Sequence, residues 1–149
     1  MIGIKSKKGG LLMKDLKTEF LDYMDLNGVR YRELNDHAVL ISYHGEKLNT
    51  ISIHVIFEQD HPGIVKLACW EIAHFPEDRL EAGFALCNRL NSRFRWVKFY
   101  LDEDRDFRAE LDLLVNPSHV GEPCTMLVAQ MAQIIDEAYP EITRALWPS

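Results

Sequence analysis

Cysteine is scarce in this 149-residue sequence, and long apolar runs are missing from it. The three cysteines, Cys69, Cys87 and Cys124, are widely spaced and form no CxxC pair, which fits a reducing compartment better than a disulfide framework. No apolar run approaches the roughly 20 residues that a membrane-spanning helix needs, and the N-terminus lacks the apolar stretch of a signal peptide. We therefore expect a cytoplasmic protein without a membrane-spanning segment.

An excess of positive charge is also lacking. The chain has 17 Lys and Arg against 23 Asp and Glu, for a formal net charge of -6. A protein that binds duplex nucleic acid carries a basic stripe instead, so we expect no nucleic-acid partner. Lys5, Lys7 and Lys8 stand alone in a stretch without acids, which predicts a basic, flexible arm over residues 1–10 that could touch an acidic partner. A single domain is expected over residues 11–149.

Motifs typical of catalysis and metal binding are missing as well. No two of the six histidines have the HxxxH or HExxH spacing of a metal site, and GxSxG and GxxxxGK[ST] are absent. Asp102, Asp104 and Asp106 resemble the start of a calcium loop, but Phe107 and Leu113 stand where that loop needs glycine and glutamate. We interpret residues 102–106 as a solvated hairpin turn, and we expect no metal and no cofactor.

Single reactive side chains give only weak functional signals. Cys69 in a predicted strand and Cys87 on a predicted buried helix stripe are expected to pack as small hydrophobic groups. Cys124 lies in the first turn of a predicted helix, where the helix N-terminus lowers a thiol pKa, whereas the neighbouring Glu122 acts in the opposite sense. His54 is interpreted as a half-exposed strand histidine, with a ligand or proton-transfer role as the alternative.

The sequence does contain a series of helix and strand patterns separated by short turns. The expected elements are a helix over 11–27, strands over 29–34, 38–43, 50–58 and 64–73, a helix over 76–93, strands over 96–101 and 108–115, and a helix from 122. Gly28 is the predicted stop of the first helix. This order, α-β-β-β-β-α-β-β-α, predicts an α+β fold with helices mainly on one face of an antiparallel sheet.

Apolar stripes predict which faces of these elements are buried. The stripe of the first helix is Leu12, Leu16, Phe20 and Met24, that of the second is Leu80, Phe84, Cys87 and Leu90, and that of the last is Leu127, Met131, Ile134, Ala138 and Ile142. Pro140 lies inside the last pattern and is expected to kink the helix or to split off a final turn ending near Trp147. The strand over 64–73 is apolar on both faces, which favours a central position in the sheet.

A group of aromatic side chains is the candidate functional feature. Alternation in the strand over 96–101 places Trp96, Lys98 and Tyr100 on one face. Trp70 and His54, from two other strands, are expected on the same uncovered face of the sheet. Because Trp and Tyr are favoured at interfaces, we predict a partner-binding surface formed by these five residues. The alternative is that a helix covers this face and that the rings belong to the core.

Two segments resemble a known family. Residues 90–104 (LNSRFRWVKFYLDED) resemble the helix-to-hairpin signature of the YbjN-like bacterial proteins, and residues 135–142 (IDEAYPEI), closing on Leu146 and Trp147, resemble the tail of that family. The resemblance covers residues 11–147, and the order of elements is similar to the type III secretion chaperone-like fold. It implies a homodimeric α+β protein that binds another protein. The family label, sensory transduction regulator, names no reaction, and the resemblance implies no catalytic residue.

Two function hypotheses follow from this sequence. The first is a non-enzymatic module, a chaperone- or adaptor-like regulator, that binds a partner polypeptide on the aromatic sheet face or in a groove. The alternative is a small-molecule sensor or enzyme with a pocket between helix and sheet. An enclosed pocket with convergent polar groups would favour the second hypothesis, and a broad open patch would favour the first.

Overall fold

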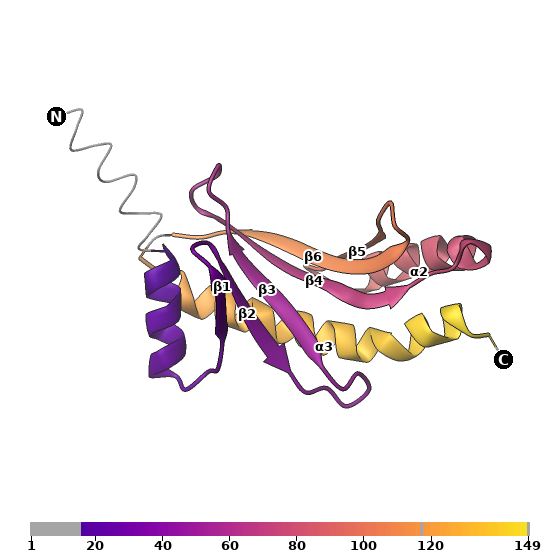
Figure 1. Cartoon of the computed structure of the whole chain (residues 1–149), viewed down its shortest axis with the longest axis horizontal. Coiled ribbons are helices and arrows are strands. Elements are labelled where there is room, and N and C mark those ends of the chain that lie inside the picture. The colour runs from indigo at the N-terminus through magenta and orange to yellow at the C-terminus, as the bar shows by residue number, and fades with distance from the viewer. Residues whose placement is uncertain (1–15, 117, 149) are drawn as a thin grey trace.

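The chain forms a single six-stranded antiparallel sheet with the strand order β1-β2-β3-β4-β6-β5 (Figure 1). The structure, a computed structural model, describes residues 16–116 and 118–148. A helical segment over 16–26 comes first. It is followed by β1 (Arg32–Asn35), β2 (Ala38–Tyr43), β3 (Ile51–Phe57), β4 (Ile64–His74), the 3-10 turn η1 (Glu77–Arg79), α2 (Leu80–Arg93), β5 (Lys98–Leu101), β6 (Asp106–Leu114) and α3 (Gly121–Leu146). The predicted α+β class and element order are confirmed.

The strand alternation also matches the prediction. Ile51, Ile53, Val55 and Phe57 of β3 are buried, and the residues between them are half-buried on the opposite face. β4 pairs with β3 on one side and β6 on the other, so its position is central. A central strand with apolar residues on both faces is the pattern that predicted this position.

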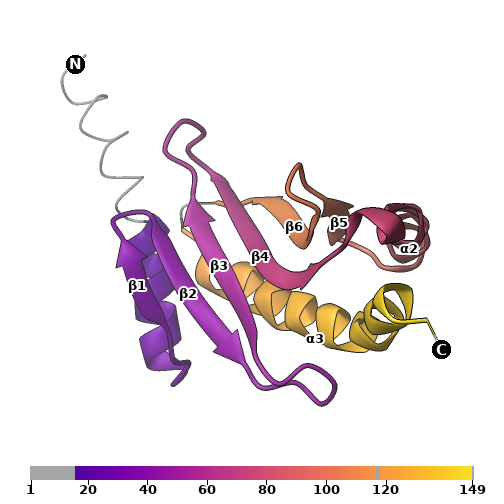
Figure 2. The same ribbon diagram turned by 45° about the vertical axis from the view of Figure 1, so that its right-hand side comes forward.

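The helices pack on one face of the sheet, where they share a continuous core with the inward side chains of the strands (Figures 1 and 2). From the first helical segment, Leu16, Phe20 and Met24 are buried, and the Phe20 ring meets Phe57 of β3 edge-on at 5.7 Å. Helix α3 lies across the sheet and buries most of its predicted stripe, Ile134 remaining partly exposed. This arrangement leaves the other face of the sheet without a helix in the described part of the chain.

Gly28 ends the first helix as predicted. Its φ of 68° lies in the left-handed region, which glycine adopts without a steric penalty. The Val29 amide donates to the Met24 carbonyl at 2.9 Å and the Gly28 amide to the Asp25 carbonyl at 3.3 Å, the hydrogen-bond pair of a Schellman motif. The predicted arm over 1–10 and the first residues of the predicted helix, Leu12 among them, lie outside the described residues.

The predicted buried stripe of α2 is partly wrong. Phe84 is 57% exposed, whereas Leu86, Cys87 and Leu90 are buried. The buried face also includes Gly83, where an added Cβ would lie 2.7 Å from the side chain of Leu101. The Gly83 side of the helix thus approaches β5 closely and faces inward, while Phe84 faces outward.

Pro140 does not split off a final turn, so that part of the prediction is wrong. Helix α3 continues through Pro140 to Leu146, and the Trp147 amide closes its end by donating to the Thr143 carbonyl at 2.8 Å. Proline removes one helix hydrogen bond. Burial of Ala138 and Ile142 on either side of it holds both halves of the helix against the same core.

The cysteine thiols are inward-facing packing groups. Cys69, Cys87 and Cys124 are free and buried. Burial raises the pKa of Cys124 to about 12, so the helix N-terminus does not produce a reactive thiolate there. Within the residues that the structure describes, no helix combines the length and apolar character needed to cross a membrane.

Candidate functional site

The open face of the sheet is built by a row of side chains that crosses every strand. Register pairs along this row join Arg32 to Leu40, His54, Ala68, Glu110 and Lys98 in turn. Ala68 is fully buried although no described helix covers it, because its larger neighbours close over its methyl group. The face therefore presents a continuous layer of larger side chains above a small central residue.

His54 and Trp70 form the aromatic centre of this face. Their ring centroids are 4.5 Å apart and the planes are inclined by 31°. Burial lowers the pKa of His54, so at neutral pH the imidazole is uncharged and packs on the indole as a neutral aromatic ring. The structure thus brings together two of the five predicted residues.

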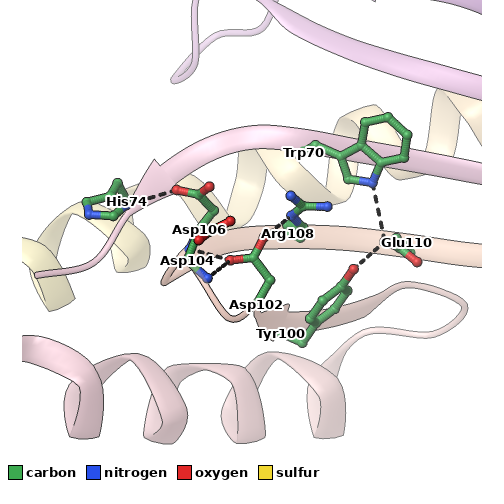
Figure 3. A network of polar contacts seen from close by, with 8 residues as sticks. All are labelled: Trp70, His74, Tyr100, Asp102, Asp104, Asp106, Arg108 and Glu110. Atoms are coloured by element: carbon green, nitrogen blue, oxygen red, sulfur yellow. Dashed lines mark hydrogen bonds and ion pairs between the residues drawn. The ribbon is translucent and has the colours of Figure 1, made fainter. Parts of the chain in front are cut away.

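Glu110 of β6 links the tryptophan to Tyr100. Its carboxylate accepts hydrogen bonds from Trp70 Nε1 at 3.3 Å and from the Tyr100 hydroxyl, and the Lys66 ammonium lies 3.4 Å from its second oxygen (Figure 3 shows the first two). Burial acts to raise the pKa of Glu110, but the hydrogen bonds from Tyr100 and Trp70 and the charge of Lys66 outweigh it and hold that pKa below its usual value. The carboxylate therefore stays ionised and fixes both rings.

Cationic groups complete the surface around the rings. Lys98 Nζ lies 5.7 Å from the Tyr100 ring centroid, and the Arg108 guanidinium lies 5.8 Å from that of Trp70. Both distances are within the range of cation–π attraction. The resulting surface has half-buried aromatic rings at its centre and charged side chains at its margin.

Trp96 does not lie in the sheet. Its φ of 77° places it in the turn between α2 and β5, and β5 begins two residues later at Lys98, so the strand predicted from 96 starts too early. Its side chain is 58% exposed. Strand alternation does not determine where the side chain of a residue in a left-handed turn points. The predicted position of Trp96 on the same strand face as Tyr100 therefore has no basis in the sheet.

The acidic turn is held by contacts within the chain. The carboxylate oxygens of Asp102, Asp104 and Asp106 come within 4.8 Å of one another. Asp102 accepts the amides of Asp104 and Asp106, each at 2.9 Å, and pairs with Arg108, while Asp106 meets His74 Nδ1 at 2.9 Å (Figure 3). Two of the three carboxylates are therefore engaged by protein groups, as in a hairpin turn closed by its own side chains.

A second carboxylate, Asp136 of α3, acts as a clasp for the β2–β3 loop. It accepts the backbone amides of Glu46, Lys47 and Leu48 at 2.8–3.0 Å. A Cβ added at Gly45 would lie 2.3 Å from its Oδ1, so the loop needs glycine at that position. These contacts line a cavity of about 450 Å³ between the loop and α3. Within this cavity the Asp136 carboxylate is already engaged by three loop amides, and the lining also includes His44, Gln133 and Glu137.

Replacing Asp136 by asparagine should lower the free energy of unfolding at pH 7 by about 1 kcal/mol, a value kept small because the carboxylate is near water. The amides of Leu48, Lys47 and Glu46 hold the pKa of Asp136 below its usual range. A depressed folded pKa stabilises the protein above the unfolded pKa of about 3.9, and that stability is lost as pH falls through the folded value. Urea titrations across pH 3–7 measure this difference.

The matched control is Glu137→Gln, which removes the same charge from the next, exposed position of α3. Its unfolding free energy should follow that of the wild type at every pH. If Asp136→Asn showed the same pH dependence as the wild type, Asp136 would not be the clasp.

Sequence reasoning missed Glu110 and Asp136. The role of Glu110 depends on the pairing of β4 with β6, in which His74 and Asp106, for example, are partners although they are 32 residues apart in the sequence. Asp136 lies within the 135–142 segment that carries the resemblance to the family. A carboxylate in a strand next to an aromatic-rich strand indicates a shared hydrogen-bond acceptor such as Glu110, but only once the register of the two strands is known.

Comparison with protein families identifies the family of this chain. The sequence model of the YbjN family, described as a putative bacterial sensory transduction regulator, matches residues 19–144. The chain belongs to the YbjN family. None of the curated proteins matches the sequence.

Solved structures with the same fold include YbjN itself from E. coli, described as a putative transcription regulator, with a TM-score of 0.61 and 15% identity over 85% of this chain and 90% of that chain. A chain of the heterodimeric ExoU–SpcU complex from the type III secretion system of Pseudomonas aeruginosa gives a TM-score of 0.57 and 14% identity, covering 86% and 98% of the two chains. A chain of the HopA1–SchA chaperone–effector complex gives 0.54 and 16%, covering 86% and 95%. The YbjN-type fold is therefore shared with proteins solved in complex with a partner.

Proposed function

We propose that this YbjN-family protein is a non-enzymatic adaptor that binds a partner polypeptide on the open face of its sheet. The observation that carries the proposal is the arrangement of Trp70 and Tyr100 around Glu110, with His54 packed on Trp70, on a face that no described helix covers. Rings already fixed by hydrogen bonds lose little entropy when a partner buries them. A margin of cationic side chains supplies the polar rim that partner-binding surfaces typically have.

The comparisons support a binding role rather than a reaction. The family description names regulation, and two of the similar structures are complexes, one of them between a chaperone and an effector. The proposal extends to a cytoplasmic location, which the three free cysteines support, and to a homodimer, which sedimentation analysis tests.

The surface favours an extended partner with apolar side chains. The indole of Trp70 and the ring of Tyr100 offer flat apolar contact, whereas the nearby Lys66 and Lys98 offer donors to main-chain carbonyls. Because the oxygens of Glu110 already have three donors, the centre of the face is a poor acceptor for further amides. Apolar side chains at the centre and carbonyls at the margin are the expected ligand chemistry.

The three tryptophans of the chain allow a direct test of this proposal. Peptides selected from a displayed library of random segments of about 12 residues, a length suited to crossing several strands, serve as the probe. Each peptide is titrated into 15N-labelled protein, and the indole N–H signals of Trp70, Trp96 and Trp147 are followed. We expect the Trp70 signal to shift and the Trp147 signal, which lies at the end of α3, to stay in place.

A selected peptide that shifts Trp147 and leaves Trp70 unchanged would place binding on the helix side and contradict the open face as the site. A library that yields no peptide for the wild-type protein would count against the polypeptide-binding function as a whole.

A further inference from the structure

A groove between α2 and α3 carries concentrated positive charge. It has a volume of about 270 Å³ and is lined by Arg79, Ala82, Ala85, Arg89, Glu141, Arg144 and Ala145. Its lining residues belong to α2, α3 and η1. Helices α2 and α3 lie on the helix side of the sheet, away from the open face (Figures 1 and 2). Three arginines against one glutamate contrast with the net charge of -6 for the whole chain.

The arginines of the groove fall into two kinds. Arg79 is fixed by donating from Nε to the Ala145 carbonyl at 2.8 Å, and Arg93, just beyond the groove, pairs with Glu141. Arg89 and Arg144 are exposed, and neither guanidinium has a hydrogen-bond or ion-pair partner among the described residues. Arg79 and Arg93 are therefore held by contacts within the protein. The guanidinium groups of Arg89 on α2 and Arg144 on α3 line the groove from opposite helices with their donors available.

The floor of the groove explains how a ligand could approach both guanidinium groups. Ala82 and Ala85 of α2 and Ala145 of α3 are small, so the two helices leave a channel with little side-chain bulk between Arg89 and Arg144. The neighbouring Glu141 is occupied by Arg93, which reduces its repulsion of an incoming anion. A guanidinium presents its donors in a planar fork that matches a carboxylate bidentately.

We propose that this groove binds a short acidic segment of a partner protein, with one carboxylate on Arg89 and another on Arg144. The acidic character of the whole chain disfavours a long polyanion such as RNA, because phosphates beyond the groove would meet net negative charge. A segment with two or three carboxylates matches the small volume and the two available forks. The site is separate from the open face, and a partner could engage either surface without the other.

The test uses a fluorescein-labelled peptide of about eight residues in which Glu alternates with Ala, and its fluorescence anisotropy reports binding to the full chain. We expect Arg89→Gln/Arg144→Gln to weaken binding by about tenfold or more, because both charged forks are removed. The lysine variant, Arg89→Lys/Arg144→Lys, keeps the charge but loses the planar fork of donors. Its affinity for the peptide should lie between that of the wild type and that of the glutamine variant. Circular dichroism melts verify that every variant is folded.

The matched control is Arg30→Gln/Arg32→Gln, which removes the same charge at the β1 edge of the sheet. This variant should bind the peptide within about twofold of the wild type, since general electrostatic attraction is weak on an acidic protein. Equal losses in the two glutamine pairs would overturn the site, and so would wild-type protein that fails to bind the peptide.

Two further measurements distinguish this proposal from binding of RNA or phosphate and from binding at the open face. A single-stranded RNA or inorganic phosphate that displaced the peptide more effectively than a Glu-rich competitor would overturn the assignment to carboxylates. The open-face variant Trp70→Ala/Tyr100→Ala should bind the acidic peptide as the wild type does, because the two surfaces are on different sides of the molecule. Failure of the groove and failure of the open face are therefore measured independently.

Discussion

Replacing Phe107 by alanine is expected to lower the free energy of unfolding by about 3–5 kcal/mol, the usual cost of deleting a buried phenyl ring. Phe107 of β6 is fully buried, and its ring packs 5.7 Å from both Phe75 and Phe99. The three rings join β6 to β5 and to the segment leading into η1, so a cavity at Phe107 loosens all three contacts. Urea denaturation followed by tryptophan fluorescence measures the loss.

The control for this variant lies on the same strand. Leu114→Ala removes an apolar side chain that is 85% exposed, and its unfolding free energy should change by about 0.5 kcal/mol or less. Phe107→Leu keeps most of the volume and should recover more than half of the loss. Similar unfolding free energies for Phe107→Ala and Leu114→Ala would contradict the packing described for β6.

Periodicity predicted the parts of the fold that local sequence controls. The alternation of Ile51, Ile53, Val55 and Phe57 assigned β3 and its buried face, and Gly28 marked the end of the first helix. Each of these assignments depends on neighbours within a few residues. The side of α2 that faces inward is that of Gly83, Leu86, Cys87 and Leu90, where Gly83 lies close to Leu101, and an apolar stripe that includes Phe84 does not predict this contact.

The candidate site was only partly predictable for the same reason. His54, Trp70 and Tyr100 were assigned to one face, but the residue that joins two of them, Glu110, is positioned by the β4–β6 pairing across the intervening α2 and β5. The β4–β6 register also shifts between Cys69 and Ala73, so alternation alone would group Ile72, which belongs to the core, with Trp70 of the open face. Long-range register and a bulge are tertiary features, and one sequence does not specify them.

The two segments that carry the resemblance to the YbjN family share a structural role. In the first, Asn91 of α2 binds both main-chain groups of Phe99, accepting its amide at 2.7 Å and donating to its carbonyl at 3.0 Å. In the second, Asp136 of α3 holds three amides of the β2–β3 loop. The first contact satisfies main-chain groups of the edge strand β5, and the second satisfies those of a loop at the ends of β2 and β3. The recognisable motifs thus maintain the sheet, and the open face lies outside them except for the β5 residues.

Removing the two rings of the open face together should abolish most of the binding of a selected peptide. Trp70→Ala/Tyr100→Ala is expected to weaken it by about 100-fold, because Trp and Tyr anchors dominate the energy of such surfaces. Tyr100 and Trp70 share Glu110 as their acceptor, so the single variants should not add up to the effect of the double variant. Isothermal titration calorimetry of the wild type, both single variants and the double variant measures this coupling.

The matched control removes two exposed rings from the helix side of the molecule. Phe84 and Trp147 are 57% and 72% exposed, and Phe84→Ala/Trp147→Ala should leave peptide affinity within about twofold of the wild type. Trp96→Ala is informative beside them, because Trp96 lies in the turn before β5 and is expected to lose less affinity than Trp70→Ala. If the Phe84/Trp147 variant lost as much affinity as the Trp70/Tyr100 variant, apolar exposure alone would explain binding. The ordered centre around Glu110 would then have no role in recognition.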